Sequence, residues 1–124
     1  MINQITLYIG AFLVTVWEIA HLYPTANVVR DFGELSPDNK NIITMEWIIE
    51  GIALIFIGVL VATVTFIDPF SPVSKAVYWL TFGALNVLSV ISLFTGFKVN
   101  FIPFKLCPAI FTGASLLILW GILA

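Results

Sequence analysis

The chain has 124 residues, of which 60% are hydrophobic and only 10% are charged, and its formal net charge is −2. Soluble domains carry about 25% charged residues, so this composition argues against a soluble fold and for an integral membrane protein. The weak negative charge argues against nucleic acid as a partner, and the single cysteine, Cys107, excludes an internal disulfide. We expect one integral membrane domain over residues 1–124 and interpret Cys107 as a small apolar helix residue.

Four stretches have the apolar length that a transmembrane helix needs, which is roughly 20 residues. The first has neither a basic leading segment nor a small-residue cleavage site, so we expect it to remain as a helix. Two later stretches follow a serine and a proline, Ser36–Pro37 and Ser71–Pro72, the pattern of an N-cap before the first helical residue. Pro103 is expected to begin the fourth helix. The spans lie at about 5–23, 45–67, 75–97 and 103–124.

The connections predict an all-α bundle of four transmembrane helices built from two helical hairpins, with both termini on one side. The first connection, 24–41, is long and polar, and the second helix is expected to begin near Pro37, about two turns before the hydrocarbon. The other connections, 68–74 and 98–102, are short. Basic residues gather at the first and third connections, while Lys75 alone lies on the other side. The positive-inside rule therefore predicts those connections inside and the termini outside. We expect the membrane to be a bacterial inner membrane. The basic residues of the inner side are Arg30, Lys40, Lys98 and Lys105.

Glu18, His21 and Glu50 stand out because they lie inside otherwise apolar spans. A charge there costs several kcal/mol unless it is paired, hydrated or neutralised. At 1.5 Å per residue, Glu18 lies about 7–8 Å and His21 about 3 Å below the end of the first span. Glu50 enters the second span from the same side at a similar depth. We therefore expect these residues to form a site in the membrane half next to the long connection, with Asn86 and Lys105 as secondary members.

Helical spacing predicts which way these side chains point. Glu18 and His21 share one face of the first helix, and Glu46 and Glu50 share one face of the second. Polar side chains within spans usually face the bundle or a water-filled cavity, so both faces are expected to point inward around a pocket that opens towards the long connection. The apolar residues on the first face are Leu7, Ala11 and Val14, and those on the second are Ala53, Ile57 and Leu60.

Each member of the expected site also has a purely structural interpretation. Lys105 can pair with Glu18 or Glu50 and hold the helices in register. His21 can form a hydrogen bond with Glu18 or with water near the interface. Asn86 can link two helices through a hydrogen bond.

The remaining features of the spans favour structural roles. Tyr23 and Trp47 belong to the interfacial aromatic belt, so no aromatic site is expected there. Gly51 and Gly58 are expected to allow close approach of helices. Pro108, one turn into the fourth span, is expected to free a carbonyl and kink the helix.

Two kinds of enzyme are alternatives to a binding site. Glu18-Ile-Ala-His21 has the Glu-x-x-His spacing of carboxylate metal sites in helical bundles, but those sites carry the motif twice. One histidine argues against a dinuclear site and excludes a bis-histidine haem within one chain, which leaves a single-metal site of Glu18, His21 and Glu50 as a minor alternative. We expect no metal. The other alternative is acid–base chemistry by the same three residues, by analogy with membrane sterol isomerases.

The order of parts resembles the DoxX-like group of small four-helix membrane proteins. A first span is followed by a long polar connection with a proline, and two closely linked spans finish the chain. Between them, the second span carries Glu50-Gly51-Ile52-Ala53-Leu54 and continues to Gly58. The resemblance implies a four-helix membrane fold, and some members of the group resemble quinol-oxidase or redox-complex subunits.

Our leading hypothesis is a non-catalytic protein of DoxX-like type that binds a lipid-like or quinone-like molecule or serves as a small subunit. A few polar groups in a mostly apolar site fit such a ligand. A larger membrane complex or a homo-oligomer is a further expectation. The polar anchors would be Glu18, His21 and Glu50, with Asn86 and Lys105 in support.

Overall fold

The computed structural model covers residues 1–124 and contains α-helices, one 3-10 turn and no β-strand. The elements are α1 (Gln4–Leu22), α2 (Thr25–Asp31), α3 (Pro37–Ile67), α4 (Pro72–Phe94), η1 (Gly96–Lys98) and α5 (Ile102–Leu123). The prediction of an all-α bundle is confirmed. The helices α1, α3, α4 and α5 are long and apolar enough to cross a membrane, so the chain is an integral multi-pass membrane protein.

The helix starts follow the capping chemistry of the sequence. The Ser36 hydroxyl accepts a hydrogen bond from the Asn39 N–H at 3.2 Å, and the Ser71 hydroxyl accepts one from the Ser74 N–H at 3.0 Å. Helix α3 begins at Pro37, as predicted, while α5 begins one residue before Pro103. The short elements α2 and η1 do not follow from the hydropathy pattern, because both lie in connections rather than in apolar spans.

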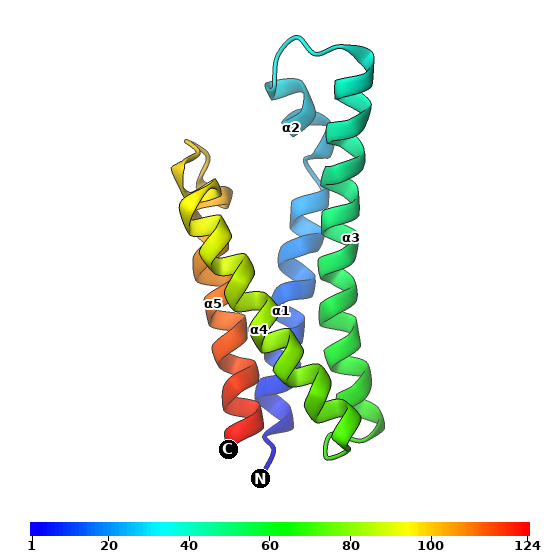
Figure 1. Ribbon diagram of the computed structural model, residues 1–124, viewed down its shortest axis with the longest axis vertical. Helices are drawn as coiled ribbons and strands as arrows, with labels where there is room; N and C mark the ends of the chain where they lie inside the picture. The colour runs from blue at the N-terminus through cyan, green and yellow to red at the C-terminus, as the bar shows by residue number, and fades with distance from the viewer.

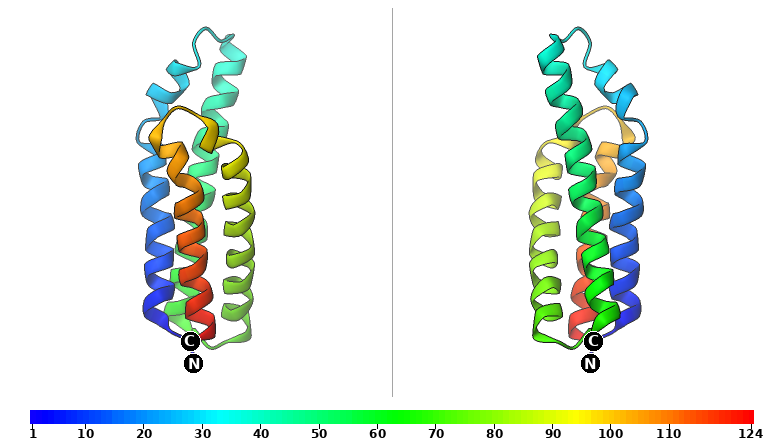
Figure 2. Two further views of the ribbon diagram at one scale, coloured as in Figure 1. Left: turned by 90° about the vertical axis from the view of Figure 1, so that its left-hand side faces the viewer. Right: turned by 90° about the vertical axis from the view of Figure 1, so that its right-hand side faces the viewer.

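The bundle consists of two helical hairpins whose termini lie at one end. Helices α1 and α3 run side by side, and α4 and α5 form the second hairpin (Figure 1). Helix α1 packs on both α3 and α5, whereas α4 packs mainly on α5. Figure 2 shows both termini at the end opposite α2, and the Asn3 N–H donates to the Gly121 carbonyl there at 2.9 Å. The two predicted hairpins are confirmed.

The apolar core lies nearer the termini, and the two hairpins diverge towards the α2 end (Figure 1). All four long helices contribute to this core, so it fastens the hairpins to each other. The buried apolar side chains are Leu7, Ala11, Val14, Leu54, Val61, Tyr78, Leu85, Phe111, Ala114 and Ile118. The divergence leaves the other end of the bundle less tightly filled, and Glu18 and Glu50 lie towards that end.

Two glycines bring α3 close to α1, as the sequence predicts. A Cβ atom on Gly58 would lie 2.8 Å from the Ala11 carbonyl oxygen, and one on Gly51 would lie 2.6 Å from Leu22 Cγ. A Cβ on Gly58 would press on backbone, so α1 and α3 could not approach this closely there with a larger residue, whereas one on Gly51 would meet the flexible Leu22 side chain, which can shift. The close contact at Gly58 therefore constrains the rotation of α3 about its own axis.

This rotation corrects one expectation about α3. The buried face of α3 carries both glycines. The face that carries Glu46 and Glu50 does not point into the bundle, and both carboxylates are exposed. The inward direction predicted for α1 holds, because Glu18 is buried on the same face as the apolar residues predicted with it. The buried residues of α3 are Gly51, Leu54, Gly58, Val61 and Thr65.

Candidate ligand-binding site

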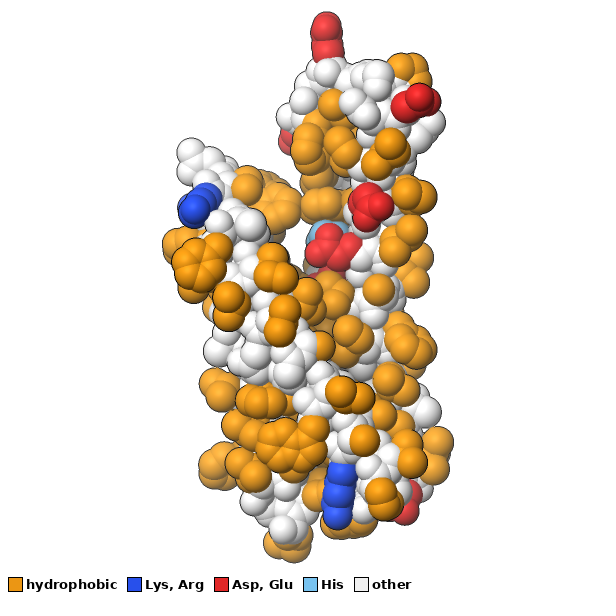
Figure 3. Space-filling view, viewed as in Figure 1, with side chains coloured by type: hydrophobic (Ala, Val, Ile, Leu, Met, Phe, Trp, Pro, Cys, Tyr) orange, Lys and Arg blue, Asp and Glu red, His pale blue; other side chains and the backbone are white.

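Glu18, His21 and Glu50 line one cavity of about 190 Å³ between the two hairpins. We call it the carboxylate cavity. Its opposite walls come from α4, η1 and α5. In Figure 3 the histidine and neighbouring acidic side chains are visible in the hollow between α3 and the α4–α5 hairpin. The fold thus gathers three residues, from α1 and α3, that the sequence placed only at a common depth.

Glu18 is the deepest charged group of this cavity. Its side chain is 1% exposed, and its Oε2 atom has no hydrogen-bond partner. It lies four residues before the end of α1 at Leu22, which is about 6 Å along the helix. Buried polar atoms are nearly always paired, and leaving one unpaired costs about 1–3 kcal/mol. An unpartnered oxygen in a cavity wall is a place for a hydrogen-bond donor.

Glu50 differs from Glu18 because it is exposed while lining the same cavity. It lies on the open side, on α3. Glu46, one turn nearer α2 on the same helix, is also exposed but does not line the carboxylate cavity. The two carboxylates of the cavity therefore have different surroundings, one enclosed by protein and one at the entrance.

His21 is held by Trp47 of α3 through two hydrogen bonds and a ring stack. The Trp47 Nε1–H donates to the His21 carbonyl at 3.0 Å, and His21 Nε2 lies 3.3 Å from the Trp47 carbonyl. The two rings stack with their centroids 3.9 Å apart and their planes 12° from parallel. Because a carbonyl oxygen only accepts, Nε2 carries the hydrogen, and the Nδ1 atom of the neutral ring is left as an acceptor.

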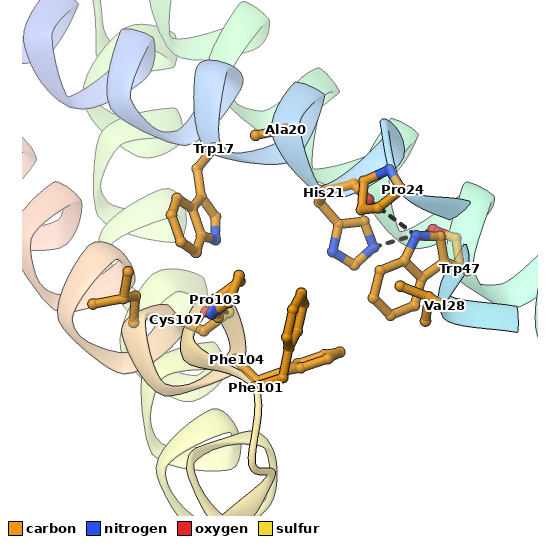
Figure 4. A pocket seen from close by; sticks show the side chains of 11 residues that line it. Trp17, Ala20, His21, Pro24, Val28, Trp47, Phe101, Pro103, Phe104 and Cys107 are labelled. Carbon is orange, nitrogen blue, oxygen red and sulfur yellow. Dashed lines mark hydrogen bonds between the residues drawn. The ribbon is translucent and has the colours of Figure 1, made fainter. Parts of the chain in front are cut away.

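A second cavity of about 200 Å³ adjoins the first, and its walls are mostly aromatic and aliphatic. We call it the aromatic cavity. Trp17 and Phe104 line it from facing helices, and Trp47 closes the side where it stacks on His21 (Figure 4). The Trp47 and Phe104 rings meet edge to face with centroids 5.7 Å apart. The two cavities share the residues His21, Phe104 and Cys107.

Sequence reasoning missed this aromatic wall. The position of Trp47 near the end of a span predicts only that it belongs to the interfacial aromatic belt. Its contact with His21 depends on how α1 and α3 are paired, which hydropathy does not reveal. Trp17 directly precedes Glu18, and that adjacency was the one available signal. Cys107 reads as an ordinary apolar residue but lies between the two cavities.

The two secondary candidates lie outside both cavities. Lys105 Nζ donates to the Phe97 carbonyl at 2.8 Å and lies 5.1 Å from the centroid of the Phe97 ring. The expected pairing of Lys105 with Glu18 or Glu50 is not formed. Asn86 Nδ2 donates to the Phe82 carbonyl of its own helix at 2.7 Å, so it does not link two helices.

The α4–α5 hairpin is fastened next to the cavities by polar contacts around Pro108. The Ser89 hydroxyl of α4 lies 3.0 Å from the Pro108 carbonyl, to which it can donate, and 2.6 Å from the Thr112 hydroxyl of α5. These contacts hold the part of α5 that provides Cys107, next to Pro108, and Phe104, one turn before it.

No three metal-binding side chains come together in this structure in a way that could hold an ion. Glu18, His21 and Glu50 share a cavity but form no such group. The single-metal alternative therefore has no preformed ligand set, whereas the same three residues are placed for hydrogen bonding and charge interaction with a molecule in the cavity.

No protein-family model, no curated protein and no solved structure matches this chain. The function of the site therefore rests on its own geometry.

Proposed function

We propose that this protein is a small, non-catalytic membrane protein of DoxX-like type that binds a lipid-like or quinone-like molecule. The observation that carries the proposal is that two cavities lie next to each other, one with Glu18, His21 and Glu50 in its wall and one lined mainly by aromatic and aliphatic side chains. A molecule with one polar end and one apolar body fits this arrangement.

The size of the cavities supports an amphipathic ligand that occupies both. Ligand sites for drug-sized molecules are about 300–1,000 Å³, and each cavity alone, at about 190 and 200 Å³, is smaller than that. The shared wall of His21, Phe104 and Cys107 makes them neighbours. Side-chain movement at Phe104 would join them into one site of ordinary size.

The depth of the polar groups supports the same class of ligand. Glu18 lies about one helical turn below the end of α1, in the zone where headgroups give way to hydrocarbon. A lipid-like molecule entering from the membrane would keep its apolar part among aromatic side chains and bring its polar end to this depth. Such a ligand would also supply the partner that Glu18 Oε2 lacks.

Mass spectrometry of co-purifying molecules tests this proposal. The wild-type protein and a Glu18→Gln/Glu50→Gln variant are extracted in the same mild detergent, and their bound small molecules are identified. We expect one species enriched in the wild type and lost from the variant. Glu46→Gln is the matched control, because Glu46 is an exposed carboxylate of α3 outside the carboxylate cavity. Identical background lipids in all three samples would refute the proposal.

We further propose the bacterial inner membrane as the location, with the termini outside the cell and the α2 and η1 connections inside. Four basic residues lie on the α2 and η1 side and one on the other, which favours this orientation. Fusions of alkaline phosphatase and of green fluorescent protein to the C-terminus test it. Phosphatase activity without fluorescence is the expected result, and the reverse would overturn the orientation.

Membership of a larger membrane complex or a homo-oligomer is part of the same proposal for a subunit. Native mass spectrometry of the detergent-extracted protein measures it directly. A mass of one chain with no other protein attached would contradict this part and leave ligand binding to be decided separately.

The second candidate function is an acid–base enzyme that uses Glu18, His21 and Glu50. It is favoured by one observation, the presence of all three in the wall of one cavity. An isomerase of this kind exchanges a carbon-bound hydrogen of its ligand with solvent. Incubating the co-purified molecule with the protein in heavy water would reveal deuterium uptake that Glu18→Gln abolishes. Absence of deuterium uptake would contradict the enzyme and leave ligand binding as the proposed function.

A further inference from the structure

The side chains of the carboxylate cavity offer hydrogen-bond acceptors, because their donors are already used. The Ser92 hydroxyl donates to the Ser89 carbonyl at 2.9 Å, and the Thr95 hydroxyl donates to the Ile91 carbonyl at 2.6 Å. Both bonds lie within α4 or at its end. What each hydroxyl presents to the cavity is therefore a lone pair.

The two other donors of this cavity are used in the same way. His21 Nε2 faces the Trp47 carbonyl at 3.3 Å, and the Cys107 thiol lies 3.5 Å from the Pro103 carbonyl of its own helix. His21 Nδ1 remains as an acceptor in the neutral ring. Every ordinary donor side chain in this wall is thus directed to the backbone.

The cavity also has carboxylates without a cation. Glu18 and Glu50 both line it, and Glu18 Oε2 is buried without a partner. The nearest lysine in the sequence of the facing helix, Lys105, is directed to the Phe97 carbonyl instead. A charged or polar group at this depth requires a partner, and no side chain of the protein supplies it.

We propose that the polar end of the bound molecule is a protonated amine, which donates to Glu18 and is neutralised by the two carboxylates, while its apolar body occupies the aromatic cavity. This inference rests on the proposed function, since it names the class of ligand for the same site. An ammonium group brings both the N–H donors and the positive charge that the cavity lacks. Phe104 and Phe111 in the wall of the carboxylate cavity add a favourable surface, because cations are attracted to the faces of aromatic rings.

The hydrogen-bond donors and acceptors of the carboxylate cavity also distinguish an amine ligand from a quinone. Quinone oxygens are acceptors, so they would meet the lone pairs of Glu50 and His21 Nδ1 and would find a donor at Glu18 only in its protonated form. The indole N–H of Trp17 is a donor in the adjoining aromatic cavity, but Trp17 does not line the carboxylate cavity. A quinol, which carries two hydroxyl donors, is the neutral rival of the amine.

Isothermal titration calorimetry in dodecyl maltoside micelles tests the inference with probes of matched chain length. Dodecylamine, which is protonated at pH 7, is compared with 1-dodecanol, and decylquinol and decylquinone are titrated beside them. We expect saturable binding of dodecylamine at least about tenfold tighter than that of dodecanol, because the alcohol keeps one O–H donor but lacks the positive charge that strengthens a hydrogen bond to a carboxylate. This comparison uses the wild-type protein and needs no variant to fold.

Two variants then locate the binding. Glu18→Gln should weaken dodecylamine binding by about tenfold or more, while Glu46→Gln should stay within about twofold because its carboxylate lies outside the cavity. Circular dichroism checks that both variants keep their helical content. An equal loss in both variants would mean attraction to surface charge and would overturn the inference.

The remaining outcomes separate this inference from the proposed function. If decylquinol or decylquinone binds saturably and depends on Glu18 while dodecylamine does not, the amine is wrong and the binding function stands. If dodecylamine binds no tighter than dodecanol and no probe saturates, the amine is again wrong. The co-purification experiment then decides the binding function by itself.

Discussion

Replacing Glu18 with methionine should stabilise the protein while removing its ligand binding. Glu18 is 1% exposed and its Oε2 atom has no partner, so the folded state carries the full cost of burying that atom. Methionine has a similar length, is unbranched and flexible, and fills irregular spaces well. Nothing in the hydrogen-bonding network of the spans is lost at Oε2, because no bond is made there.

The expected gain follows from that unpaired atom. A buried polar group without a partner costs about 1–3 kcal/mol, and replacing it with an apolar group of similar shape removes the cost. We therefore expect Glu18→Met to raise the free energy of unfolding by about 1–3 kcal/mol. Residues kept at such a cost are typical of functional sites, where stability and activity compete.

Unfolding by titration of sodium dodecyl sulfate into dodecyl maltoside micelles, followed by far-ultraviolet circular dichroism, measures this free energy. Glu46→Met is the control, since Glu46 is exposed on the neighbouring helix and should change stability by no more than about 0.5 kcal/mol. A loss of stability in Glu18→Met would refute the reasoning, because it would mean that Glu18 makes a stabilising interaction. An equal gain in both variants would attribute the effect to general hydrophobicity.

Three further predictions use the same unfolding measurement. Gly58→Ala should lower stability by about 1–3 kcal/mol because its Cβ would press α3 against α1, whereas Gly83→Ala meets nothing within 4 Å and should be neutral or stabilising by up to about 1 kcal/mol. A similar loss in both would show that helix packing is not the cause. Trp47→Phe should cost about 1 kcal/mol through the lost bond to the His21 carbonyl and also weaken ligand binding, and unchanged binding would separate Trp47 from the site. Ser71→Ala should cost about 1 kcal/mol through the lost N-cap of α4, and no change would mean that water replaces the cap.

The four long helices are predictable from the sequence because each is an apolar run of bilayer length. Their starts are predictable where local chemistry decides them, as at Ser36 and Ser71, whose side chains cap the next turn. The helix α2 is not predictable in this way. It is seven residues long, and a helix that short is not stable by propensity alone.

The membrane half that holds the candidate site also follows from the sequence, since helical rise converts residue number into depth. The inward direction of Glu18 follows from its spacing with apolar residues of α1. The direction of Glu50 does not, because the rotation of α3 depends on how it packs on α1, with its close contact at Gly58. That contact exists only once the helices are paired.

The sequence by itself determined that the chain spans a membrane four times, where most of its helices begin and at what depth its charged residues lie. These properties depend on local composition and on the fixed rise of a helix. Only the tertiary structure decided that Trp47 holds His21, that Lys105 turns away to Phe97, and that Glu18 and Glu50 share a cavity without a cation. Those facts depend on which helices pack together and how each is rotated, and such contacts join residues far apart in the chain.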